Sequence, residues 1–137
     1  MILLKNNLSK LETIEEMIFQ SGIKTVHFHF DKTPVKALYV DGVIGLRPGI
    51  HFKEKISILA EEYCHAKYNY GNILKDKKQE QIARHKSYEI IAPIKDIQKA
   101  IKNGITTSYE LSEYLEIPEE TLIKILEYYK SKGFSFF

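Results

Sequence analysis

The sequence has a single cysteine and almost no excess charge of either sign. Cys64 is the only thiol among 137 residues, which excludes an internal disulfide and is consistent with a reducing compartment. The 20 Lys and Arg residues and 18 Asp and Glu residues leave a net charge of +2. A chain this close to neutral provides no strong electrostatic argument for nucleic acid as a partner.

The sequence also lacks long apolar runs. None approaches the roughly 20 residues that span a membrane, and the apolar residues 1–4 are too short for the core of a signal peptide. Glycine-rich phosphate loops, nucleophile elbows and repeats are absent. With 44% apolar and 28% charged residues, the composition is that of a globular protein. We therefore expect a cytoplasmic protein without a membrane partner.

Hydrophobic periodicity predicts both helices and strands. Helices are expected at residues 8–20, 53–69, 78–91, 94–102, 108–115 and 119–131, and strands at 24–30, 35–40 and 43–47. Ser9 and Glu12 have the spacing of a capping box at the first helix. Asp41-Gly42 between two apolar runs favours a hairpin with a type I′ turn. Together these signals predict an α+β fold containing a three-stranded antiparallel sheet.

The predicted strand 24–30 alternates between apolar and polar residues. Val26, Phe28 and Phe30 share one face, which is typical of a half-buried strand. His27 and His29 share the other face, where two imidazoles could form part of a metal site. Two histidines on the solvent side of a strand also need no ligand, and we prefer that interpretation.

The centre of the chain carries the most informative pattern, Glu61-Glu62-Tyr63-Cys64-His65. On a helix, Glu61 and His65 lie one turn apart on the same face, and Glu62 is rotated by about 100° from Glu61. Two ligands one turn apart, with a carboxylate beside them to accept a proton from the attacking water, form the arrangement of a zincin helix. The apolar residues just before this pattern indicate a helix packed inside the domain.

A longer string around this pattern, LAEEYCHAKYNYGNILKDKKQEQIARHKSYEIIAPI, resembles the phage-type branch of the ImmA/IrrE metallopeptidases. The family pattern runs Leu-Ala-Glu-Glu-Leu-Gly-His, then Gly-Asn-Ile, then Lys-Gln-Glu-x-x-Ala-Arg, and ends in an apolar stretch with Pro. The matching positions here are Leu59, Ala60, Glu61, Glu62, His65, Gly71, Asn72, Ile73, Lys78, Gln79, Glu80, Ala83, Arg84 and Pro93. The C-terminal string YELSEYLEIPEETLIKILEYYKSKG resembles the same branch.

The sequence departs from the usual zincin motif at one place and from the family pattern at two. Glu61 stands where the usual zincin motif has its first histidine, although a carboxylate is also a legitimate zinc ligand. Tyr63-Cys64 replaces Leu-Gly, and Ser87 stands where the family often has Ala. Cys64 adds bulk inside the helix, so the departures bear on helix packing more than on the ligands.

The resemblance implies a fold, a metal and a set of site residues. Residues 1–93 would form a zincin-like domain and residues 94–137 a helical, helix-turn-helix-like subdomain. The metal ligands would be Glu61, His65 and Glu80, with Glu62 as the general base. His85 is the alternative to Glu80, but it faces another side of its helix. Zinc is the expected metal, while a carboxylate-rich ligand set leaves manganese or iron open.

The implied activity is that of a metal-dependent peptidase from a phage or mobile element, which acts on a helix-turn-helix repressor. The alternative is an inactive module of the same fold that only binds the repressor. Direct DNA binding is not expected, because Glu119-Glu120 begins the would-be recognition helix and would meet phosphate. A thiol nucleophile is also disfavoured, since Cys64 and His65 are adjacent on a helix and point about 100° apart.

Overall fold

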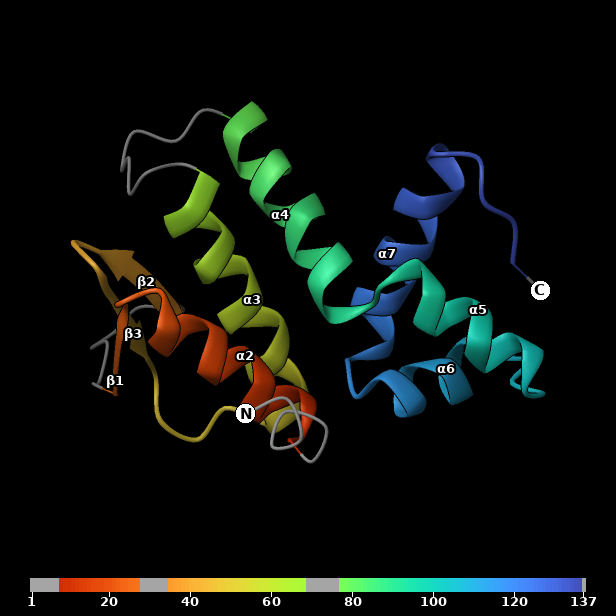
Figure 1. Ribbon diagram of the computed structural model, residues 1–137, viewed down its shortest axis with the longest axis horizontal. Coiled ribbons are helices and arrows are strands. Elements are labelled where there is room, and N and C mark those ends of the chain that lie inside the picture. Colours follow the sequence, from red (N-terminus) through yellow and green to blue (C-terminus); the bar gives the residue numbers. More distant parts are fainter. Residues whose placement is uncertain (1–7, 28–34, 69–76, 137) are drawn as a thin grey trace.

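The computed structural model describes residues 8–27, 35–68 and 77–136. Within these ranges the chain forms six helices and one three-stranded sheet, an α+β arrangement as predicted (Figure 1). The elements in chain order are α2 (Lys10–Gln20), β1 (Lys24–His27), β2 (Ala37–Val40), β3 (Val43–Leu46), α3 (Phe52–Tyr68), α4 (Lys77–Ile91), α5 (Ile94–Lys102), α6 (Ser108–Leu115) and α7 (Glu119–Ser131).

Local sequence signals account for most of these boundaries. Ser9 caps α2, and both hydrogen bonds of the predicted capping box with Glu12 are present. Asp41 and Gly42 both have positive φ, at 49° and 80°, as the central residues of a type I′ turn require. This turn joins β2 to β3 as an antiparallel hairpin, in which Val40 pairs with Val43.

The sheet is mixed, so the prediction of a fully antiparallel sheet is wrong. Its strand order is β1-β3-β2, and β1 runs parallel to β3, with Lys24 opposite Val43 and His27 opposite Leu46. The central strand, β3, is also the buried one, and its Ile44 and Leu46 are fully enclosed. Strand β1 pairs with the edge of β3 that the hairpin leaves open.

The prediction of a half-buried strand is also wrong for the part of it that the structure describes. All four residues of β1 are exposed, and Val26 retains 40% of its accessible surface. The remaining residues of the predicted strand, including His29, lie outside the described ranges. A pairing of His27 with His29 at a metal therefore remains untested.

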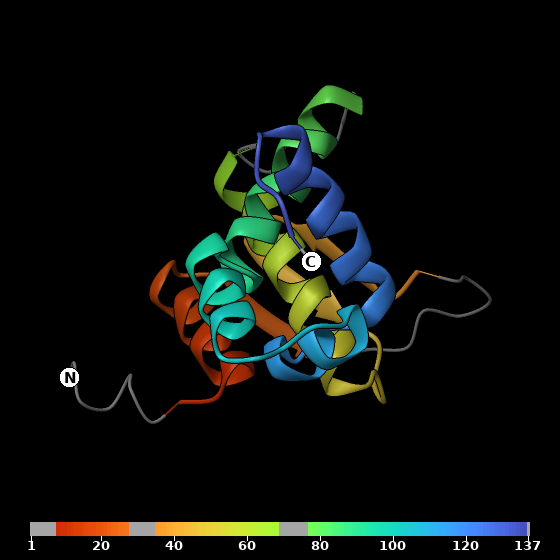
Figure 2. The ribbon, with the colours of Figure 1, turned by 90° about the vertical axis from the view of Figure 1, so that its right-hand side faces the viewer.

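One cluster of buried apolar side chains connects the two predicted domains. It includes Ile14 of α2, Ile44 of β3 and Leu59 of α3, together with Ile97 of α5 and Leu122 of α7. Figures 1 and 2 show α5, α6 and α7 grouped on one side of the molecule, opposite the sheet. The core thus continues across residue 93, where the sequence suggested a boundary. None of the described helices is long and apolar enough to cross a membrane.

Lys10 joins α2 to the C-terminal part of the fold. Its Nζ donates hydrogen bonds to the carbonyl oxygens of Ile91, at the end of α4, and Leu115, at the end of α6. The last carbonyls of a helix carry partial negative charge, which offsets part of the cost of burying the ammonium group. Burial lowers the pKa of Lys10 from 10.5 to about 8, although nearby Asp96 and Glu116 oppose this shift.

Replacing Lys10 by Met should lower the free energy of unfolding by about 1–3 kcal/mol, because two partly buried carbonyls lose a charged donor. Lys99→Met, at an exposed position of α5, is the matched control and should change stability little. Urea denaturation at neutral pH measures both variants.

The same comparison has a pH dependence with a definite sign. The pKa of Lys10 is about 8 in the folded protein, against the ordinary lysine value of 10.5 that applies once the chain unfolds, so the unfolded chain binds more protons between these values. The wild-type protein should therefore gain stability relative to Lys10→Met as the pH rises from 8 towards 10. A constant difference across this window would contradict the placement of Lys10.

Candidate functional site

The candidate site lies where α3 packs against α4. The two helices lie side by side and run in opposite directions (Figure 1). Arg84 on α4 places its Nε 3.4 Å from Oε1 of Glu61 on α3, so these residues face one another. Both helices rise about 1.5 Å per residue. His65 follows Glu61 by four residues on α3, and Glu80 precedes Arg84 by four residues on α4. Because the helices run in opposite directions, both steps lead the same way, so His65 and Glu80 lie at a similar height along the helix pair.

The predicted site residues have very different exposure. His65 is buried, with 4% of its surface accessible, and one carboxylate oxygen of Glu62, Oε2, is enclosed as well. The side chain of Glu61 is 34% exposed and that of Arg84 is 50% exposed. Glu80 is partly buried in the first turn of α4. The buried imidazole and enclosed carboxylate thus lie beside a partly solvated ion pair.

The predicted metal ligands do not converge on one point. Among the described residues, no group of three or more His, Cys, Asp or Glu side chains is placed to hold a metal ion. Glu61 is paired with Arg84 instead. Two carboxylates and one imidazole are suitable donors for a divalent metal. Binding through Glu61, His65 and Glu80 would require their side chains to reorient and Arg84 to leave Glu61.

The alternative ligand, His85, belongs to another surface of α4. Its ring stacks on Tyr128 of α7, with 4.3 Å between centroids, and lies 5.9 Å from the ring of Tyr88. Burial is the main cause that lowers the pKa of His85 below 6.5, with Lys132 and Arg84 adding to it. An uncharged His85 at neutral pH therefore forms part of an aromatic cluster.

Cys64 is enclosed beside the predicted ligand His65. None of its surface is accessible, and burial is the main cause that raises the pKa of its thiol to about 12. A thiol with such a pKa is protonated at neutral pH and is a poor nucleophile. These observations agree with the interpretation of Cys64 as a packing residue.

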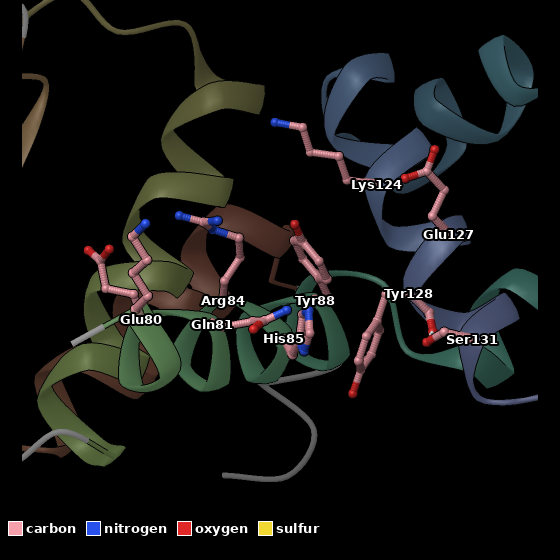
Figure 3. Close-up of a pocket in the computed structure, with 10 residues that line it drawn as sticks. Glu80, Gln81, Arg84, His85, Tyr88, Lys124, Glu127, Tyr128 and Ser131 are labelled. Atoms are coloured by element: carbon pink, nitrogen blue, oxygen red, sulfur yellow. Dashed lines mark hydrogen bonds between the residues drawn. The ribbon is translucent and has the colours of Figure 1, made fainter. Parts of the chain in front are cut away.

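A polar groove between α4 and α7 was not foreseen from the sequence. It has a volume of about 540 Å³, and Figure 3 shows its walls. Its lining residues are Lys77, Glu80, Gln81, Arg84, His85, Tyr88, Lys124, Glu127, Tyr128 and Ser131. On each helix these residues recur at spacings of three or four, so each set forms one stripe. The spacing of each stripe could be detected in the sequence. That the two stripes face one another depends on how α7 packs against α4.

No protein-family model, curated protein or solved structure matches this chain. The resemblance to a known family therefore stays a prediction from the sequence.

The thiol of Cys64 should resist modification in the folded protein. At pH 8 we expect a disulfide reagent such as Ellman's reagent to react fully only after the chain is unfolded, because the folded thiol is buried and protonated. The released chromophore measures the reaction with and without denaturant. Rapid stoichiometric reaction of the native protein would contradict the burial of Cys64.

Proposed function

We propose that this chain is a metal-dependent peptidase of ImmA/IrrE type with a zincin-like fold. It would act on a helix-turn-helix repressor in the cytoplasm of a bacterial host, as part of a prophage or mobile element. The main support is the packing of α3 against α4, in which Arg84 of α4 contacts Glu61 of α3 and so faces the helix that carries two of the predicted ligands.

Each site residue has a distinct role in this proposal. Glu61, His65 and Glu80 would hold the metal, and zinc is the first candidate. A bound metal supplies Lewis acidity that polarises the scissile carbonyl and makes water more acidic. Glu62 accepts the proton of the attacking water and transfers it to the leaving amine.

Arg84 determines how readily the carboxylate of Glu61 becomes available to a metal ion. Its guanidinium neutralises the carboxylate of Glu61, but both side chains are partly exposed. Ion pairs of this kind contribute about 0–1 kcal/mol. A divalent cation can compete with so weak a pair, and the freed Arg84 side chain already borders the groove between α4 and α7.

The same ion pair favours a second candidate function, an inactive module that binds the repressor without cleaving it. Arg84 places a positive charge beside Glu61, where the peptidase would place its metal. In such a module Arg84 is a permanent structural substitute for the metal. The two candidates therefore differ in what happens when Arg84 is removed.

Arg84→Met should raise the affinity for Zn²⁺ by up to about fivefold if the chain binds metal through Glu61, because the competing cation is lost. Lys86→Met removes a charge from an exposed position of the same helix and should leave the affinity unchanged. Calorimetric titration and elemental analysis measure affinity and stoichiometry, with one metal expected per chain.

The result that favours the inactive module is equally definite. Neither the wild-type protein nor Arg84→Met would then bind metal, and Arg84→Met would only lose stability. Such a result would rule out a metal at Glu61.

Glu62→Gln should abolish cleavage of the repressor, with a loss of about 10²–10⁴-fold or more, while folding and metal content stay unchanged. Glutamine keeps the shape of the side chain and loses its basicity. Co-expression with a repressor encoded beside this chain, followed by gel analysis of the repressor, measures cleavage. Glu54→Gln, on the same helix, is the control and should cleave normally.

Full cleavage by Glu62→Gln would exclude Glu62 as the general base. Repressor inactivation without any cleavage, by both the wild-type protein and this variant, would instead identify the binding module.

A further inference from the structure

The groove between α4 and α7 has the size and chemistry of a binding site. Its volume of about 540 Å³ lies within the range of about 300–1,000 Å³ common for ligand sites. Glu80 and Arg84 contribute to its α4 wall. The groove therefore begins beside the region of the proposed metal site and extends away from it towards α7.

Positive charge comes from both walls of the groove. Arg84 extends from α4 and Lys124 from α7, and Figure 3 shows both side chains at the groove. Lys124 forms no ion pair with any residue that the structure describes. A carboxylate entering from solvent would therefore meet an available ammonium group and a guanidinium that is only weakly held by Glu61.

Three rings also line the groove. The rings of His85, Tyr88 and Tyr128 are in mutual contact, with centroids 4.3–5.9 Å apart. The hydroxyl of Tyr128 donates a hydrogen bond to Glu89, which fixes that ring. Burial keeps the pKa of His85 below its usual value. This cluster provides a preformed surface against which the apolar parts of a ligand can pack.

Two carboxylates in the groove select among acidic ligands. Glu80 and Glu127 line it together with the cations, so a ligand with negative charge along its whole length would be repelled in places. A nucleic acid strand is such a ligand. A peptide carries isolated carboxylates and has backbone N–H groups that can donate to Glu80 and Glu127.

We propose that the groove between α4 and α7 binds an extended peptide segment that carries acidic and aromatic residues, with a carboxylate held between Arg84 and Lys124. This inference rests on the proposed function in one respect, that the peptide is a segment of the repressor that the peptidase cleaves. Peptide binding itself requires neither metal nor turnover. The two proposals can therefore fail separately.

The experiment measures fluorescence anisotropy of the full chain with a labelled peptide composed of Gly, Ser, Tyr and Glu. A second peptide has Gln at every Glu position, and an oligothymidylate of similar length is the third probe. We expect the Glu peptide to bind and the Gln peptide to bind at least about threefold more weakly. Added salt should weaken binding of the Glu peptide, because the groove is open to solvent.

Lys124→Gln should weaken binding of the Glu peptide by about threefold and have no effect on the Gln peptide. Lys130→Gln is the matched control, since Lys130 is also exposed on α7 and does not line the groove. Circular dichroism of both variants verifies that they are folded. The proposal is overturned if neither peptide binds, if the two peptides bind equally, if Lys130→Gln has the same effect as Lys124→Gln, or if the oligothymidylate binds more tightly than the Glu peptide.

Discussion

The antiparallel packing of α3 against α4 is the contact on which both the candidate site and the groove depend. Ala60 on α3 and Ala83 on α4 are completely buried, and small side chains of this kind allow two helices to approach closely. Arg84 and Glu61 lie across the same pair of helices. A shift of α4 along α3 by one turn would separate them and would also move Glu80 away from the height of His65. The candidate site therefore depends on the position of α4 along α3.

Arg84 connects these proposals physically, because its side chain is next to Glu61 and also lines the groove. A metal that takes Glu61 would release the guanidinium. The released charge would then join Lys124 as a second available cation for a peptide carboxylate. Metal binding would thereby strengthen the anion site without any movement of the backbone. In the inactive module, Arg84 stays with Glu61 and Lys124 is the main cation that meets a bound peptide.

Lys10 plays a comparable part at the other end of α4. It connects α2 to the last turns of α4 and α6, and the buried core passes through the same region. Burying an ammonium group is unfavourable, and the two carbonyls with nearby Asp96 and Glu116 offset only part of that cost, since the pKa of Lys10 is lowered to about 8. Docking of the C-terminal helices onto the body thus depends on a polar contact as well as on apolar packing.

The sequence by itself determined the local features of the fold, which depend on residues only a few positions apart. The capping box at Ser9, the turn at Asp41 and Gly42 and the helix boundaries could be predicted, because hydrogen bonds and side-chain contacts only a few residues apart decide them. It also placed Glu61 and His65 one turn apart on a single helix. The metal ligand set remains a prediction, and among the described residues its members are not placed to hold one metal ion.

Tertiary structure alone decided which distant segments meet. The parallel pairing of β1 with β3, which made the antiparallel sheet wrong, joins strands with no local signal for each other's direction. The Glu61–Arg84 ion pair, the Lys10 contacts and the groove between α4 and α7 likewise join residues far apart in the chain. Periodicity identifies the faces of each element, but the choice of partner for each face depends on how all the elements pack together.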